Sequence, residues 1–175
     1  MASFTYAGQL NSSEAPVTID VVIKNSAHVA VGEAVTLDAG VDSADGIGDR
    51  ILGVCVGIYD VNGLALDNAD TSQLDGTWVS ATQTYTAGAD NVTDDYVTAK
   101  VIVDKMSLFR NDADADLTKA MVASHFHIVS ATQIDGDTNA QDKGQFWLAK
   151  LDPEDASVGF FCISESVMDP YVQIT

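Results

Sequence analysis

Three aspartates on alternate positions, Asp112, Asp114 and Asp116 in FRNDADADLTKA, are spaced as in calcium-binding loops. An EF-hand loop that starts at Asp112 requires glycine at its sixth position and a bidentate glutamate at its twelfth. The chain has Leu117 and Ala123 there, so the standard calcium site is excluded. Two interpretations remain for the three aspartates: a solvated turn that caps a helix, or a calcium site completed by backbone carbonyl groups.

A second metal-binding pattern is SHFHI, in which His125 and His127 lie on one face if the segment is a strand. The pair is similar to the first half of the cupin motif. That motif also needs a glycine where this chain has Lys119, and a glutamate in the window of Ala131 and Thr132. Structural histidines are therefore favoured over the metal centre of an oxygenase or isomerase.

Covalent and glycosidic chemistry has no defined signature in this sequence. No Gly-x-Ser-x-Gly elbow occurs, and the apolar runs around Cys55 and Cys162 favour buried, inert thiols over a disulfide. Aromatic residues can form a sugar-binding platform, but in a β protein they more often belong to the core. The candidates are Trp78, Tyr85, Phe146 and Trp147. We therefore predict no catalytic residue, no cofactor and no enzymatic activity.

The composition describes an acidic globular protein. Its 175 residues include 26 Asp and Glu against 8 Lys and Arg, a formal net charge of −18, and 46% are hydrophobic. This charge repels polyphosphates and anionic lipids, which argues against nucleic acid and membranes as partners. The sequence has no signal-peptide pattern and no apolar run near the roughly 20 residues that span a bilayer. We expect a soluble protein made in a cytosol.

Strands must position most of these residues, because apolar and polar residues alternate along much of the chain. Segment 17–24 is predicted as a half-buried strand and 50–60 as a fully buried one, followed by a hairpin turn at Asn62-Gly63. Two short strands are predicted around Gly32-Glu33. Long strands are predicted at 77–86 and 96–109, and short strands at 125–130, 145–151, 157–164 and 171–175.

One helix is predicted, because Leu117, Ala120 and Met121 form an apolar stripe and Asp116 precedes it as an N-cap. The polar segment 67–76 is the predicted internal boundary. The fold class is therefore all-β. A small β-barrel-like subdomain is expected at 1–69, where the first sixteen residues can form an extended arm. A β-sandwich or barrel with one short helix is expected at 77–175.

Several phrases of the sequence resemble those of tailed-phage virion proteins. AHVAVGEAVTLDAG followed by RILGVCVGIYDVNGLAL is similar to small β-barrel modules of such proteins, and residues 96–120 and 126–164 are similar to a recurrent segment of phage structural proteins. The resemblance covers most of residues 17–164. It implies a head decoration or auxiliary capsid protein, with the major capsid protein as partner and homotrimers at the quasi-threefold axes of the lattice.

Three hypotheses follow. The first is a non-enzymatic virion protein, made in the host cytoplasm, that binds and stabilises the outer surface of the head. The negative charge suits that surface better than the DNA-facing interior. The second is a β-sandwich carbohydrate-binding or adhesion module that uses Trp78 or Trp147, and a tail or baseplate component is a further alternative to the head. The third is a cupin-like metalloenzyme centred on His125 and His127.

Overall fold

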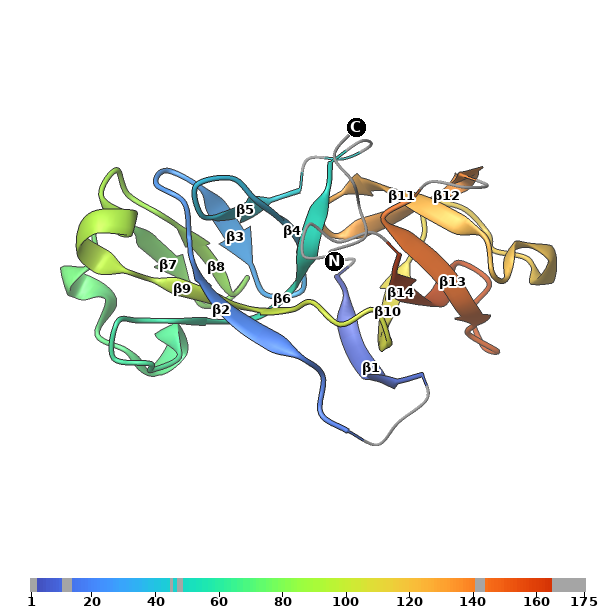
Figure 1. Cartoon of the computed structure of the whole chain (residues 1–175), viewed down its shortest axis with the longest axis horizontal. Coiled ribbons are helices and arrows are strands. Elements are labelled where there is room, and N and C mark those ends of the chain that lie inside the picture. Colours follow the sequence, from blue (N-terminus) through green and yellow to red (C-terminus); the bar gives the residue numbers. More distant parts are fainter. Residues whose placement is uncertain (1–2, 11–13, 45, 47–48, 141–143, 165–175) are drawn as a thin grey trace.

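The computed structural model describes residues 3–10, 14–44, 46, 49–140 and 144–164. In these residues, fourteen strands form three antiparallel sheets (Figure 1). The all-β prediction is confirmed. None of the three sheets closes into a barrel in the described part of the chain. The strand predicted at 171–175 lies outside the described residues.

The spatial order of the strands in each sheet differs from their order along the chain. From one edge to the other, the six-stranded sheet contains β1 (Thr5–Gln9), β10 (Ser107–Asp112), β14 (Val158–Ile163), β13 (Phe146–Leu151), β11 (His125–Ser130) and β12 (Gln133–Ala140). The five-stranded sheet contains β2 (Thr18–Val22), β9 (Thr98–Ile102), β6 (Ile51–Tyr59), β4 (Ala34–Leu37) and β5 (Val41–Ser43). The three-stranded sheet contains β3 (His28–Ala30), β8 (Thr84–Thr86) and β7 (Thr77–Val79).

Helical structure is confined to single turns in the described residues. The turns are the 3-10 helices η1 (Leu66–Asn68), η2 (Thr71–Gln73) and η4 (Lys119–Met121), and the π-helical turn η3 (Asn91–Asp95). No helix in the described segments is long and apolar enough to cross a membrane.

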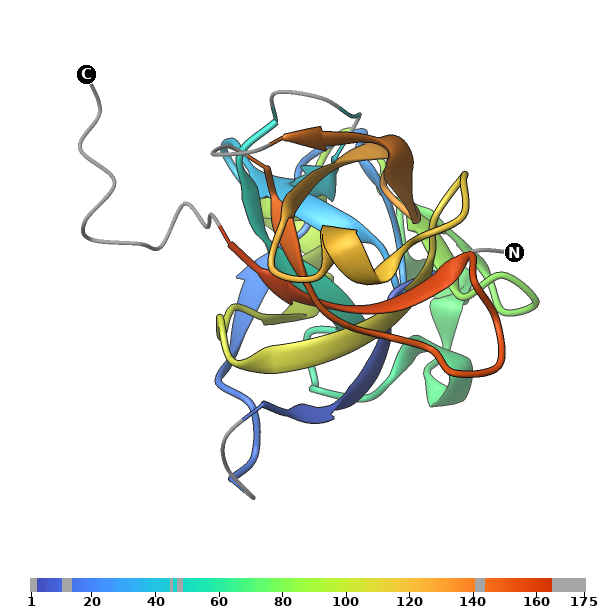
Figure 2. The same cartoon turned by 90° about the vertical axis from the view of Figure 1, so that its right-hand side faces the viewer.

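Two apolar clusters fill the molecule, and β6 supplies side chains to both. Ile51 and Val54 pack in the first cluster, which lies against the six-stranded sheet. Leu52 and Cys55 pack in the second cluster, with residues of the five- and three-stranded sheets. The strands of the six-stranded sheet are curved (Figure 2), and they supply many side chains of the first cluster. The prediction of a buried strand at 50–60 is therefore confirmed, because β6 (Ile51–Tyr59) is the wall between two cores.

Strand pairing crosses the predicted boundary at 67–76. β6 pairs with β9, and β3 pairs with β8, so residues from both sides of the boundary share two sheets. The six-stranded sheet also joins distant segments, because β1 pairs with β10 and the Phe4 ring packs in the first cluster. Residues 5–9 are therefore an edge strand of the chain's own sheet. The division into domains at 1–69 and 77–175 stays a prediction.

The two predictions of long strands were wrong, because a turn interrupts each segment. Within 77–86, the chain reverses between β7 and β8, where Gln83 has a positive φ of 50°. Within 96–109, the Asp104 carboxylate accepts a hydrogen bond of 2.9 Å from the backbone N–H of Met106. β-branched residues alone do not reveal such a turn, and here it moves the chain from one sheet to another.

The predicted helix is shorter than expected and begins later. It is the single turn Lys119–Met121, and its N-cap is Thr118 instead of Asp116. The backbone N–H of Leu117 donates to the carbonyl group of Ala156 at 2.8 Å. Because this hydrogen bond goes to a distant segment, the chain before Thr118 is tied to the six-stranded sheet and is not available to a longer helix.

The turn predicted at Asn62-Gly63 is present, and Asp60 stabilises it. The Asp60 carboxylate accepts hydrogen bonds from the backbone N–H groups of Leu64 at 2.8 Å and Asn62 at 2.9 Å, and Gly63 has a left-handed φ of 77°. The bond from Leu64 makes the largest contribution in holding the pKa of Asp60 below its ordinary value. The same direction of pKa shift applies to Asp67, Asp70, Asp152 and Asp155, each of which accepts nearby hydrogen bonds.

A lowered carboxylate pKa makes the stability depend on pH. Ionised Asp60 favours the folded state above its unfolded pKa of about 4, and this contribution is lost as the pH falls through the folded pKa. We expect the melting temperature of the wild type to exceed that of Asp60→Asn near pH 6, and the difference to shrink toward about pH 3. Asp20→Asn, on the exposed face of β2, is the control for loss of one charge. Circular dichroism melts measure both, and a difference that grows on acidification would contradict the assignment.

Candidate functional site

A groove of about 790 Å³ lies over the outer face of the three-stranded sheet. Because side chains alternate along a strand, Val29 of β3 and Tyr85 of β8 point into the second cluster. The residues on either side of Val29 and Tyr85 point the other way and line the groove. The lining from this sheet and its hairpin turn consists of His28, Ala30, Val79, Ser80, Ala81, Thr82, Gln83, Thr84 and Thr86.

The opposite wall of the groove comes from three distant segments. Ser3 precedes β1, Glu33 lies in the turn between β3 and β4, and Thr132 lies in the turn between β11 and β12. The groove is therefore lined by the three-stranded sheet, by the turns before β4 and β12, and by the residue before the N-terminal strand. No single stretch of the sequence contains it.

The turn that holds Glu33 is fixed from both sides. The backbone N–H of Phe4 donates to the carbonyl group of Gly32 at 2.8 Å, and the N–H of Ala34 donates to that of Ala131 at 2.7 Å. Gly32 has a φ of 88°, and a Cβ atom there would lie 2.9 Å from the Cβ of Ser3. Glycine is required at this position because the conformation is left-handed and the N-terminal segment passes close by.

Glu33 is a buried acidic residue, with 7% of its surface exposed. Its Oε2 accepts hydrogen bonds from the backbone N–H of Ala30 at 2.8 Å and from the Ser43 hydroxyl at 2.5 Å. In the described part of the chain, Oε1 accepts no hydrogen bond and no lysine or arginine forms an ion pair with this carboxylate. Glu33 therefore lines the groove with one oxygen satisfied and the other free.

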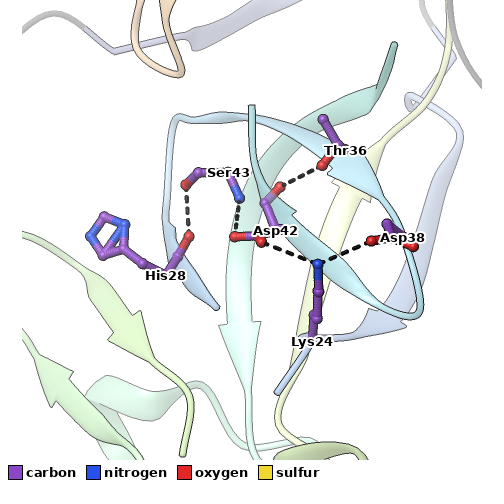
Figure 3. A network of polar contacts seen from close by, with 6 residues as sticks. All are labelled: Lys24, His28, Thr36, Asp38, Asp42 and Ser43. Atoms are coloured by element: carbon purple, nitrogen blue, oxygen red, sulfur yellow. Dashed lines mark hydrogen bonds and ion pairs between the residues drawn. The ribbon is translucent and has the colours of Figure 1, made fainter. Parts of the chain in front are cut away.

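Ser43, which donates to the Glu33 carboxylate, is itself held by contacts with neighbouring residues. The Ser43 hydroxyl lies 2.7 Å from the carbonyl oxygen of His28, and its backbone N–H donates to Asp42 at 2.9 Å (Figure 3). The nearest basic residue in this network, Lys24, is held by Asp38 at 3.0 Å and by Asp42 at 3.8 Å. The imidazole ring of His28 points away from this ion-paired group (Figure 3). Lys24 is therefore committed to other carboxylates.

Two smaller hollows adjoin the groove and share Val31 and Gln83 with it. One has a volume of about 360 Å³ and lies beside β1, where Tyr6 and Val56 contribute to its lining. The other has a volume of about 160 Å³ and contains Trp78. The three together form a hollowed surface along β3, β6 and the first residues of β1.

Neither cysteine is arranged for nucleophilic chemistry. Both are buried and free, as predicted. Burial raises the pKa of Cys55 to about 12, and the negative charge of Glu33 raises it further. Burial also raises the pKa of Cys162, to about 11, with a smaller contribution from Asp104. Because the thiolate is the reactive form, these thiols are inert at neutral pH.

The three aspartates of the opening motif do not share a partner or a site in the described residues. Asp112 ends β10, where it pairs with Val158 of β14. The Asp114 carboxylate accepts a hydrogen bond of 2.6 Å from the backbone N–H of Gly136, and Asp116 is exposed. Among the described residues, no three His, Cys, Asp or Glu side chains lie close enough together to hold a metal ion.

The two histidines do not converge on a common ligand. Nδ1 of His127 lies 3.0 Å from Oε1 of Gln145, whose side-chain NH₂ donates to the carbonyl groups of Gly46 and Asp49. Nδ1 of His125 is buried, and no hydrogen-bond partner for it lies among the described residues. His127 therefore helps Gln145 to tie β13 to the loop before β6, which is a structural role.

The four aromatic candidates for a sugar-binding platform do not form a single surface. Tyr85 and Phe146 are fully buried in different clusters. Trp78 is half-buried on β7, and its Nε1–H donates to Asp67 at 3.2 Å. Trp147 is half-buried on β13 of another sheet. The two tryptophans therefore belong to different sheets and are not paired with each other.

Sequence patterns did not single out Glu33. The sequence signal that could have identified it is an acidic residue between apolar, β-branched runs in VAVGEAVTL, where the flanking residues are predicted to be buried.

Chemically, the groove offers one carboxylate oxygen and a row of hydroxyl groups above an apolar floor. These features suit a ligand that donates hydrogen bonds.

Family models, curated proteins and solved structures were all searched, and none matches this chain.

Proposed function

We propose that the chain is a non-enzymatic structural protein of a tailed-phage virion, a decoration protein that binds and stabilises the outer surface of the head. Its partner is the major capsid protein, it acts as a homotrimer, it needs no cofactor, and it is made in the host cytoplasm. The resemblance of its sequence phrases to virion proteins supports this function. The net charge of −18 supports it too, because it suits a surface that faces solvent at high local density.

The observation that carries the proposal is the edge of the six-stranded sheet. In the described part of the chain β1 has a strand neighbour on one side only, so its other edge lies outside the hydrogen-bonded ladder of the sheet. Tyr6 on this strand is 36% exposed, Leu10 is 37% exposed and Met106 is 47% exposed. Leu10 and Met106 are adjacent, because the backbone N–H of Leu10 donates to the carbonyl group of Met106 at 2.8 Å. A neighbouring subunit or the capsid surface can cover such an edge.

Binding to heads tests this function. Heads are assembled from the major capsid protein encoded in the same genome and expanded, then mixed with the purified chain and sedimented. We expect the chain to sediment with expanded heads and to saturate at a fixed ratio to the capsid protein. Light scattering on the free protein is expected to give the mass of a trimer. A chain that stays in the supernatant at all concentrations would refute the proposal.

A pair of double variants separates the β1 edge from other exposed apolar residues. Leu10→Ser with Met106→Ser is expected to weaken head binding by at least about tenfold, because the apolar contact is lost. Val61→Ser with Leu64→Ser makes the same kind of change in the exposed turn after β6. This control is expected to bind as the wild type does. Equal binding by both double variants would show that the edge is not the contact.

A further inference from the structure

We propose that the groove over the three-stranded sheet binds the guanidinium group of an arginine side chain, presented by an extended segment of a partner protein, and that Glu33 is its counter-ion. The proposal rests on the geometry of the groove. It holds whether or not the chain is a capsid protein, so the two proposals can fail separately.

The unpaired oxygen of Glu33 is the first part of the argument. More than nine-tenths of this residue is buried, yet only Oε2 is hydrogen-bonded, to Ala30 and Ser43. Oε1 remains accessible to solvent although most of the residue is buried, so a hydrogen-bond donor and a cation can reach it. Since Glu33 lines the groove, a ligand there can supply both.

The charge of the surroundings selects a cation. Among the described residues that line the groove there is no lysine or arginine to pair with Glu33, and the imidazole of His28 forms no ion pair with it. The chain as a whole has a net charge of −18, which raises the local concentration of cationic ligands. A sugar could donate hydrogen bonds to Oε1, but it would leave the negative charge uncompensated.

The shape of the lining favours guanidinium over ammonium. A guanidinium group is planar, presents five N–H donors and is weakly hydrated, so one edge can meet Oε1 while another meets hydroxyl oxygens. Thr84 and Thr86 lie side by side on the groove face of β8, and their cross-strand partners are Ala30 and His28. The methylene stem of an arginine can lie over Ala30 and Val79. The volume of about 790 Å³ leaves room for the residues that flank the arginine.

Titration with blocked tripeptides tests the proposal. The probes are acetyl-Ala-Arg-Ala-amide, its citrulline analogue, which has the same shape without the charge, and its lysine analogue. Calorimetry at about 0.15 M salt limits attraction by distant charges. We expect the arginine peptide to bind at least about tenfold more tightly than the citrulline peptide, with lysine intermediate. Equal affinity for arginine and citrulline, or no binding at millimolar peptide, would overturn the proposal.

Substitutions in the chain locate the site. Glu33→Gln keeps the size and the acceptor for Ala30 and Ser43, and is expected to reduce affinity for the arginine peptide by about tenfold. Asp20→Asn removes one charge from the exposed face of β2 and is expected to change affinity less than about twofold. Full binding by Glu33→Gln would show that Glu33 only caps its turn. Should Glu33→Gln unfold, Thr84→Val, which leaves the carboxylate in place, is expected to weaken binding several-fold, and unchanged affinity there would count equally against the site.

Discussion

Gly53→Ala is expected to lower the free energy of unfolding by about 3 kcal/mol, a large part of the stability of a domain of this size. A Cβ atom at this position would lie 2.0 Å from the carbonyl oxygen of Ile102 and 2.8 Å from a methyl group of Val101. The first of these is a backbone atom of the neighbouring strand β9, so it cannot rotate away. β6 and β9 would have to separate in the wall between the two cores.

Gly57→Ala is the matched control, because it makes the same change four positions later on β6. The three nearest atoms to its Cβ would all belong to the Tyr59 ring, the closest at 2.7 Å, and that half-buried side chain can move. The movement would weaken the contact with Lys100, whose Nζ lies 4.9 Å from the ring centre, so a loss of about 1 kcal/mol is expected. Urea unfolding followed by tryptophan fluorescence measures both variants. Similar losses for the two would contradict the proposed packing of β6 against β9.

Phe109→Ala is expected to cost about 4 kcal/mol, because it removes the ring that anchors the N-terminal strand. Phe109 is fully buried on β10. Its ring meets Phe4 edge-on at 6.4 Å between centroids and Tyr6 at 6.3 Å, and Phe4 in turn stacks on Phe146 at 4.5 Å. The cavity would loosen β1 as well as the first cluster. Amide hydrogen exchange is therefore expected to accelerate in β1 more than in β2.

Phe160→Ala provides the comparison for this prediction. Phe160 lies on the outer side of β14, where it is partly exposed and contacts the Lys150 ammonium at 4.2 Å. Removing this ring leaves no internal cavity, so we expect a loss of about 1 kcal/mol. The difference between the two variants measures the contribution of the aromatic cluster. A loss for Phe109→Ala no larger than that for Phe160→Ala would show that the cluster does not hold β1.

The strand content was predictable from the sequence where side chains alternate or are continuously apolar. The strands β2, β6, β11, β13 and β14 all lie within predicted segments. β12 was missed because QIDGDTNA has the composition of a turn, and as an edge strand it does not need a second apolar face. β1 was missed because TYAGQ is short and polar, and its pairing with β10 is set by the Phe4 and Phe109 rings.

The groove could not be predicted, because its walls come together only in the folded chain. The lining residues are widely separated in sequence, as Ser3, Glu33, Thr84 and Thr132 show. The pairing of β3 with β8 places His28 and Ala30 beside Thr86 and Thr84. The aspartates at 112–116 attracted attention because their spacing is local. In the folded chain, two of them are taken up by strand pairing and a hydrogen bond to Gly136, so the local pattern was a poor guide to a shared site.

Electron cryomicroscopy of the mature virion tests the central claim, which is that this protein decorates the outside of the head. We expect density for an all-β protein on the outer surface of the capsid lattice, repeated around quasi-threefold axes, with β1 of each copy against the capsid or a neighbouring subunit. Density for this chain in the tail or baseplate, or virions that lack it altogether, would contradict the account.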